Sequence, residues 1–192
     1  MTNEEIIKSD ILASIEVKQK VVNSPEILKS IEKMAVEITD CIKTGGKLLI
    51  CGNGGSASDA LHIAGEIVGR FQQERKGYAA IALNSDVAIM TAVANDYGYD
   101  QVFARQVEAL MDKDDILLGI STSGNSENII RAVYKAHEIG GKAFALTGED
   151  GGKLKEICDI SFVAPSDVTA HIQEMHECAY HIICKLVEQN LM

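Results

Sequence analysis

The sequence predicts an α/β protein, a three-layer α/β/α sandwich of the flavodoxin-like type. A five-stranded parallel sheet is expected at its centre, with a helical extension at the N-terminus. Two observations lead to this prediction. After residue 46, short continuous apolar runs alternate with longer helical patterns, which is typical of parallel strands covered on both faces. Before residue 46, the apolar residues recur at helical spacing only.

Two helices are expected in residues 1–45. The first covers about residues 4–22, where isoleucines recur at helical spacing. The second begins at Ser24-Pro25-Glu26, because Ser24 can cap a helix, Pro25 suits the first helical position and Glu26 suits the positive end of the dipole. It should end at Gly45-Gly46. These isoleucine-rich helices are a candidate oligomer interface.

Residues 46–192 are expected to form the α/β core and a long amphipathic C-terminal helix over about residues 169–191. The predicted strands are residues 48–51, 79–83, 116–120, 143–147 and 160–164. No linker rich in proline, glycine or serine divides the chain, so residues 1–192 are predicted to be a single domain.

Composition and charge exclude several classes of function. The 192 residues carry a net charge of −10 and no basic cluster, which argues against nucleic-acid binding. No apolar run is long enough to span a bilayer, and the acidic N-terminus lacks the layout of a signal peptide, so we expect a cytoplasmic protein. The five cysteines form no CxxC pair and are expected to be free thiols, most of them buried.

Two polar loops each follow a predicted strand and precede a helical pattern. They are Gly-Asn-Gly-Gly-Ser at residues 52–56 and Ser-Thr-Ser-Gly-Asn-Ser at residues 121–126. Loops at the carboxyl ends of parallel strands bind ligands, and hydroxyls with unpaired helix N–H groups suit a phosphate. For either loop alone, a tight turn with a helix cap is an equally good interpretation. The first loop fits a dinucleotide fingerprint poorly, so no nucleotide cofactor is expected.

Candidate chemistry lies in two predicted helices. His62 and Glu66 are spaced i, i+4 and project from one helix face, where they can be an acid–base couple, two metal ligands or a solvated pair. In the last helix, Gln173, His176 and His181 interrupt an apolar pattern. One buried histidine alone is more often a hydrogen-bonded core residue than a catalyst. Two further histidines, His137 and His171, are interpreted as surface residues.

Four segments resemble the phosphoheptose (sedoheptulose 7-phosphate) isomerases, which have the sugar isomerase (SIS) fold. They are CGNGGSASDALHIAGE, ANDYGYDQVFARQVEAL, STSGNSENI and IQEMHECAYH, and the likeness extends over nearly the whole chain. The resemblance implies that these residues contact substrate: Asn53, Gly54, Gly55, Glu66, Asn95, Asp96, Ser121, Thr122, Ser123, Ser126 and Gln173. It also implies that His62, Glu66, Gln173 and His181 surround the reacting carbons and bind zinc in the metal-containing members.

The implied activity converts sedoheptulose 7-phosphate into D-glycero-D-manno-heptose 7-phosphate through an enediol, the first step towards nucleotide-activated heptose. Glu66 can then be the base and His181 the acid, or both can be metal ligands; the residues alone leave this open. The resemblance further implies a homotetramer whose N-terminal helices pair between subunits. Some relatives carry an aspartate where this chain has Ala170, which puts one sugar-hydroxyl contact in doubt. The product can feed lipopolysaccharide or capsule heptose.

Two other functions remain compatible with the fold. A non-catalytic SIS-fold adaptor, such as the replication-initiator-associating proteins, would be a tetrameric binding module. Such an adaptor needs no complete acid–base set, so the joint presence of Glu66, Gln173 and His181 favours an enzyme. A sugar-phosphate-sensing domain of a regulator is the other possibility, but no DNA-binding segment is attached.

Helix geometry predicts that the site is shared between subunits. Gln173 and His181 are eight residues apart, which on a regular helix is about 12 Å along the axis and about 80° in azimuth. One metal ion, with bonds of about 2.0–2.2 Å, would strain to take both from one helix. We therefore expect at least one of His62, Glu66, Gln173 and His181 to come from a neighbouring chain.

Overall fold

The computed structural model describes residues 1–192 and has a five-stranded, entirely parallel sheet in the order β2-β1-β3-β4-β5. The strands are β1 (Leu48–Gly52), β2 (Ala80–Ala82), β3 (Ile116–Ser121), β4 (Lys142–Thr147) and β5 (Ile160–Val163). The predicted fold class is confirmed. Only the second strand is clearly shorter than expected, because it lies at the edge of the sheet and pairs with β1 alone.

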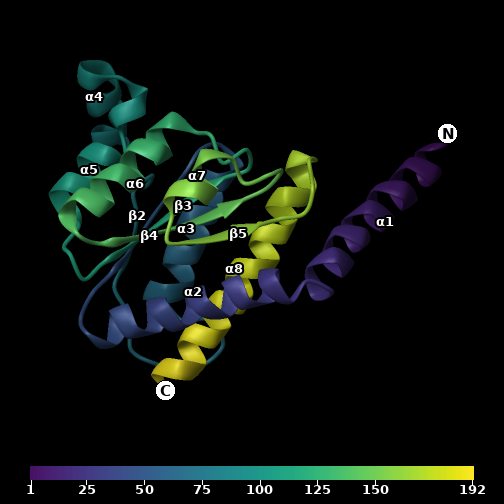
Figure 1. The fold of residues 1–192 in the computed structure, drawn as a ribbon, viewed down its shortest axis with the longest axis horizontal. Coiled ribbons are helices and arrows are strands. Elements are labelled where there is room, and N and C mark those ends of the chain that lie inside the picture. Colours follow the sequence, from purple (N-terminus) through teal and green to yellow (C-terminus); the bar gives the residue numbers. More distant parts are fainter.

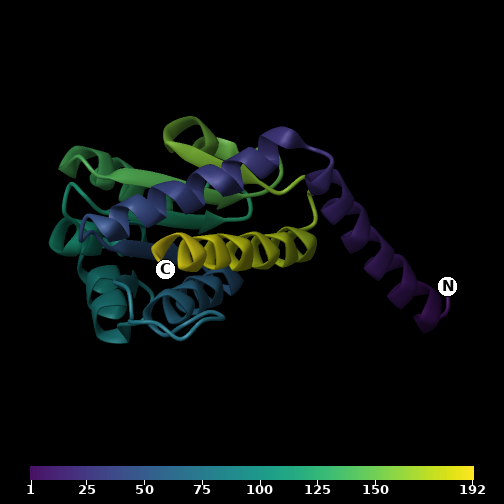
Figure 2. The same cartoon turned by 90° about the horizontal axis from the view of Figure 1, so that it is seen from below.

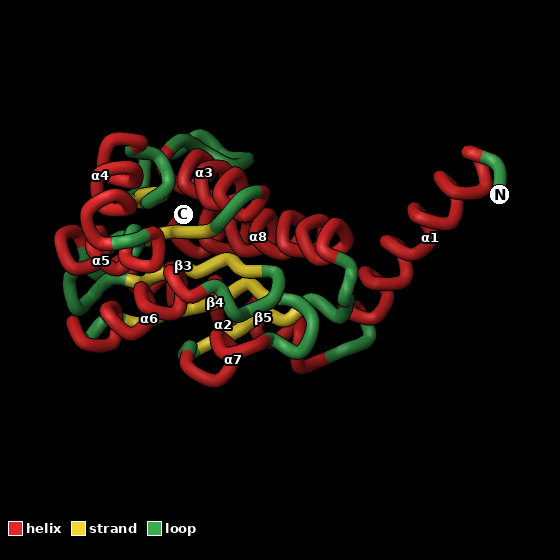
Figure 3. The backbone as a smooth tube through the Cα atoms, turned by 90° about the horizontal axis from the view of Figure 1, so that it is seen from above, coloured by secondary structure: helices red, strands yellow, loops and turns green.

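Helices cover both faces of this sheet (Figures 1 and 3). They are α1 (Asn3–Val22), α2 (Pro25–Lys43), α3 (Gly55–Val68), α4 (Val87–Tyr97), α5 (Ala104–Leu110), α6 (Glu127–Ile139), α7 (Gly152–Ile157) and α8 (Thr169–Leu191), with a 3₁₀ turn, η1 (Tyr99–Gln101). One apolar core lies between the sheet and α2, α3 and α8; the other lies between the sheet and α4, α5, α6 and α7. Every residue of β1 and β3 is buried, which explains their uninterrupted apolar sequences.

Ser24 and Pro25 start the second helix as predicted. The Ser24 hydroxyl accepts the N–H of Ile27 and Pro25 opens α2, while α1 begins with a capping box between Thr2 and Glu5. Figures 1 and 2 show α1 projecting away from the rest of the molecule. It contacts α8, where Ser14 bonds to Glu174, and the adjoining helix α2. Its Val17 and Val21 pack into the core.

One detail of the sequence interpretation was wrong. His171, expected at the surface, has a side chain only 7% exposed, because α1 lies over it and brings Asp10 to 3.4 Å from its Nε2. In α3, Leu61 and Val68 are about half exposed. The residues that pack inward from α3 are Ala60, Ile63 and Ile67.

The fold brings the two polar loops together. The chain passes from β1 to β2 on one side and later to β3 on the other, so β1 and β3 flank the point where the strand order reverses. Gly52, the last residue of β1, pairs with Ile120 of β3, and both loops therefore leave the same edge of the sheet side by side. Ligands of open α/β sheets bind in this crevice.

Two further predictions can be compared with the structure. All five cysteines are free; Cys41, Cys51 and Cys184 are buried, and the other two are partly buried. None of the helices combines the length and the apolar character that crossing a membrane requires.

Candidate active site

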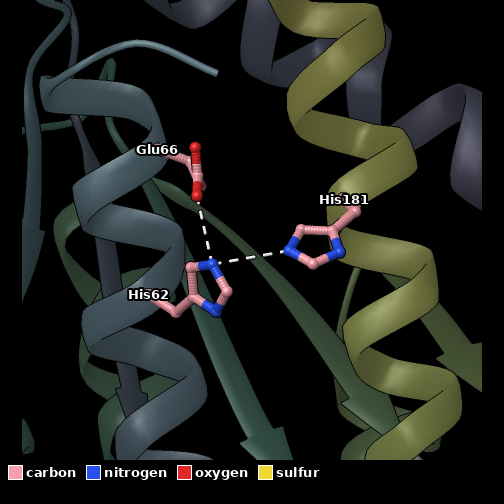
Figure 4. Close-up of side chains that lie close together, drawn as sticks. All are labelled: His62, Glu66 and His181. Carbon is pink, nitrogen blue, oxygen red and sulfur yellow. Dashed lines mark hydrogen bonds and ion pairs between the residues drawn. The ribbon is translucent and has the colours of Figure 1, made fainter. Parts of the chain in front are cut away.

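Three polar side chains meet in the space between α3 and α8. His62 Nε2 lies 3.1 Å from Glu66 Oε1 and 3.4 Å from His181 Nε2 (Figure 4). Their ligand atoms all lie within 4.8 Å of one another. The i, i+4 spacing brings the first two residues together, and the packing of α8 against α3 adds the third. One chain therefore supplies three of the four residues that were expected to surround the reacting carbons.

The donor set fits a zinc ion. Ligand atoms bound to tetrahedral zinc at about 2.0–2.2 Å lie about 3.3–3.6 Å from one another. The 3.4 Å between the two histidines falls in this range, and the 3.1 Å between His62 and Glu66 is slightly shorter. Two imidazoles and one carboxylate are ligands that zinc takes in catalytic sites, where a fourth position stays open for water or substrate. The three residues thus form a possible metal-binding triad.

Tyr180 holds the far side of the His62 ring. Its hydroxyl lies 3.0 Å from Nδ1 of His62, which leaves Nε2 as the nitrogen that faces Glu66 and His181. A metal-binding histidine is usually oriented by such a partner on its other nitrogen. The ring of Phe71 lies 5.7 Å from the ring of His181 and limits how that imidazole can turn.

Asp59 lies one turn before His62 on α3. Burial and the neighbouring charge of Glu177 raise the pKa of Asp59 to about 6, although His62 and Tyr180 act in the opposite direction. One of its carboxylate oxygens is buried without a hydrogen-bond partner. Asp59 is therefore a weaker acid than an ordinary aspartate and takes up a proton more readily near neutral pH.

The second polar loop, residues 121–126, is called the serine loop; it follows β3 and precedes α6. The hydroxyls of Ser121 and Ser126 lie 3.0 Å apart, and Ser123 Oγ accepts the N–H of Asn125. Ser126 occupies the N-cap position of α6, yet its side chain makes no capping bond. The hydroxyls and the free N–H groups of this helix start can therefore be offered to an anion. Thr122, also predicted to contact substrate, is partly exposed in the same loop.

The first polar loop, residues 52–56, is called the glycine loop, and its Asn53 side chain bonds to residues near the serine loop. Asn53 and Asn128 exchange two hydrogen bonds of 2.9 Å between their side chains, and Tyr99 donates from its hydroxyl to Asn53 Oδ1 at 3.0 Å. Gly54 has a φ of +57° and is exposed, as is Gly55, so backbone N–H groups are accessible at the start of α3. Asn53 thus links the glycine loop to the first turn of α6, the helix that follows the serine loop.

Gln173 lies at the glycine-loop end of α8. A Cβ added to Gly55 would lie 2.4 Å from Gln173 Nε2, so only glycine lets this amide approach the loop so closely. His62, Glu66 and His181 meet within one chain, so Gln173 is the one residue of the four that a neighbouring chain could still supply. That part of the shared-site hypothesis stays a prediction. Asn95 and Asp96 are exposed at the end of α4, where they bond to each other at 2.8 Å.

His176 takes no part in the cluster. It is fully buried, and its Nε2 lies 2.9 Å from the carbonyl oxygen of Thr147. Burial lowers the pKa of His176 to about 4, although the bond to Thr147 opposes the shift. It is thus a neutral, hydrogen-bonded core histidine, as expected for most single buried histidines.

Sequence reasoning missed the residues that support the site. They are Asp59, Phe71, Arg75, Tyr99, Asn128, Tyr180 and Glu188. Asn128 follows Ser126 and Glu127 at the start of a helix, where polar residues are ordinary, so the sequence does not single it out. The contacts of Tyr99 and Tyr180 depend on which helices the fold places side by side, and no spacing in the sequence indicates them.

Comparison with known proteins decides the family. A profile of the SIS domain family matches residues 13–148. A phosphoheptose isomerase of Helicobacter pylori (strain P12) is 49% identical over 188 residues, covering 97% of this chain and 96% of the relative. One from Aliarcobacter butzleri (strain RM4018) is 51% identical over 187 residues, covering 97% of each chain. The chain belongs to the phosphoheptose isomerase family.

Solved structures agree with this assignment. The phosphoheptose isomerase of Francisella tularensis superposes with a TM-score of 0.93 at 44% identity, covering 98% of this chain and 100% of that chain. The protein from Neisseria gonorrhoeae superposes with a TM-score of 0.92 at 40% identity, with the same coverage. The resemblance drawn from the four segments is confirmed, and the chain is an enzyme, a sugar-phosphate isomerase of heptose biosynthesis.

Proposed function

We propose that this chain interconverts sedoheptulose 7-phosphate and D-glycero-D-manno-heptose 7-phosphate at the His62–Glu66–His181 cluster. The observation that carries the proposal is the meeting of these three side chains between α8 and α3, the helix that begins at the glycine loop where the strand order reverses. The names of the relatives indicate the substrate class.

The serine loop is the proposed phosphate site. Ser121, Thr122, Ser123 and Ser126 offer hydroxyls, and the start of α6 adds backbone N–H groups and the positive end of its dipole. A phosphate bound there is remote from the reacting carbons, so its binding energy serves to position the carbonyl. Asn53, Gly54, Gly55, Asn95, Asp96 and Gln173 are the proposed contacts for the sugar.

The proton transfer is assigned to Glu66 and His181. Glu66 takes the proton from C1 of the ketose, which gives an enediol, and a proton is then returned to C2. The C1 hydroxyl loses its proton as the aldehyde forms, and the C2 oxygen gains one as it becomes a hydroxyl. His181 can move a proton at these oxygens, since an imidazole changes charge near neutral pH. Each such group typically contributes about 10²–10⁴-fold in rate.

Zinc is the proposed metal. His62, Glu66 and His181 would hold it, with Gln173 of a neighbouring subunit as a further ligand. With the metal bound, Glu66 would keep its second carboxylate oxygen for the C1 proton, and His181 would serve as a ligand instead of a proton carrier. When bound, zinc would polarise the substrate oxygens and so stabilise the negative charge of the enediol. Tyr180 would orient His62 with or without bound zinc, because its hydroxyl bonds to the ring nitrogen that faces away from the cluster.

The proposal includes assembly and place of action. We infer a homotetramer, because α1 exposes several aliphatic side chains on a helix that projects from the molecule. They are Ile6, Ile7, Ile11, Leu12 and Ile15. A charged sugar phosphate does not cross a hydrocarbon layer unaided, so the enzyme is assigned to the cytoplasm, where such substrates are retained.

A turnover assay tests the proposal. Purified protein is incubated with sedoheptulose 7-phosphate and with free sedoheptulose, each before and after treatment with a chelator, and the aldose is measured. We expect turnover of the phosphate ester, almost none of the free sugar, and loss of activity on chelation that zinc restores. Equal turnover of both sugars would exclude the serine loop as the phosphate site. Activity unaffected by thorough chelation would exclude the metal.

A further inference from the structure

A buried ion pair near the His62–Glu66–His181 cluster links α3 and α8, the two helices that carry the cluster. Arg75 Nε donates to Glu188 Oε1 at 3.1 Å, and the two side chains are 5% and 1% exposed. Arg75 lies in the connection that follows α3, and Glu188 lies on α8 about two turns after His181. The pair thus connects the C-terminal end of α3 to the face of α8 next to the cluster.

Arg75 closes the C-terminal end of α3. Its guanidinium donates to the carbonyl oxygen of Glu66 at 2.7 Å and to that of Ile67 at 3.0 Å. These carbonyls belong to the last turn, whose C=O groups have no partner within the helix. A further bond reaches the carbonyl oxygen of Gly69. Because Glu66 projects from this same turn, Arg75 fixes the backbone that carries the proposed base.

Glu188 holds the connection that follows. Its carboxylate accepts the backbone N–H groups of Phe71, Gln72 and Gln73 at 3.0, 2.8 and 2.9 Å. Burial alone would raise the pKa of Glu188, but these three donors and Arg75 lower it, so the carboxylate stays charged. Since Phe71 packs on the ring of His181, the same carboxylate determines where that ring can lie.

We propose that Arg75 and Glu188 are positioning residues for the isomerisation. Arg75 fixes the turn that carries Glu66, Glu188 fixes Phe71 against His181, and their ion pair sets these two halves of the cluster relative to each other. Neither residue touches the cluster's own side chains, so both act through others. The inference deepens the proposed function and rests on it for its kinetic part.

A buried ion pair can also serve stability alone, and the chain offers a matched control for that role. Lys47 pairs with Asp115, whose side chain is 2% exposed and accepts the backbone N–H groups of Lys47 and Asp112. These residues immediately precede β1 and β3, at the sheet edge opposite the two polar loops. Removing one partner of either pair leaves an uncompensated charge and destabilises the protein.

The test compares Glu188→Gln with Asp115→Asn. Ring signals of ¹³C-labelled histidines are recorded by NMR in metal-free protein, followed by zinc affinity and then kcat and KM for sedoheptulose 7-phosphate. In Glu188→Gln we expect a shifted His181 signal, zinc binding weakened about 10-fold or more, and kcat lowered about 10-fold with KM changed less than about two-fold. Asp115→Asn should lose thermal stability, with all three properties unchanged. Arg75→Lys, which keeps the charge but not the planar fork, should resemble Glu188→Gln.

A His181 signal that stays in place in Glu188→Gln would overturn the inference. So would a kcat that falls no further than in Asp115→Asn. If Glu188→Gln does not fold, Phe71→Leu tests the same link, since it removes only the ring on His181 and should shift that signal and lower kcat. A wild-type protein that fails to turn over sedoheptulose 7-phosphate would contradict the proposed function, while the histidine signals would still test the positioning.

Discussion

At Glu66, replacing the carboxylate with an amide keeps the shape of the side chain and removes its capacity to take up a proton. Glu66→Gln should therefore fold normally and keep KM within about three-fold, while kcat falls by about 100-fold or more. Steady-state kinetics and thermal unfolding measure both effects. Turnover near the wild-type rate would remove Glu66 from the mechanism.

His176 gives the protein a predictable sensitivity to acid. Burial lowers the pKa of His176 to about 4, below the unfolded value of about 6.5. Between pH 4 and pH 6.5 the unfolded chain binds more protons at His176 than the folded chain does. The contribution of His176 to the free energy of unfolding is therefore fully present above about pH 6.5 and is lost as the pH falls towards 4. The expected loss between pH 7.5 and pH 5 is about 2 kcal/mol.

His176→Gln removes this titration and keeps an N–H donor for the carbonyl of Thr147. Urea unfolding at several pH values should show a smaller acid-induced loss in the variant than in the wild type. Parallel curves for the two proteins would show that His176 does not titrate as described.

At the scale of the elements, the serine loop should govern affinity more than chemistry. Replacing Ser121, Ser123 or Ser126 by alanine leaves a phosphate oxygen without a donor, which costs about 1–3 kcal/mol and appears mainly as a raised KM. Ser30→Ala on α2 is the matched control, since its hydroxyl bonds only to the carbonyl of Ile27. Variants with lowered kcat and an unchanged KM would assign the loop another role.

The elements themselves were largely predictable from the sequence, for physical reasons. Strands such as β1 and β3 are buried on both faces, and uninterrupted apolar runs are the direct consequence. His62 and Glu66 were paired correctly because i, i+4 spacing is a local property. His171 was misplaced because its burial depends on α1, and the bonds of Asn53 to Asn128 depend on the order of the strands. Such contacts arise from tertiary packing and leave no local pattern.

At the scale of the whole molecule, the exposed face of α1 is the interface assigned to the proposed tetramer. Ile7 and Ile11 are 60% and 56% exposed on one helix. Replacing both with glutamate should reduce the proposed tetramer to smaller species, because charges would have to be buried at the interface. Sedimentation velocity measures the change. Gln19→Glu adds negative charge to the same helix and should leave the tetramer intact. An unchanged size in the isoleucine variant would place the interface elsewhere.

The central claim is that the His62–Glu66–His181 cluster isomerises sedoheptulose 7-phosphate by proton transfer. NMR of the reaction in D₂O tests it most directly, because a proton held on a side chain between C1 and C2 can exchange with solvent, whereas a hydride that shifts directly between the carbons cannot. We predict D-glycero-D-manno-heptose 7-phosphate that carries deuterium at C2. An aldose that retains the original hydrogen at C2, or no aldose from correctly folded protein, would contradict the account.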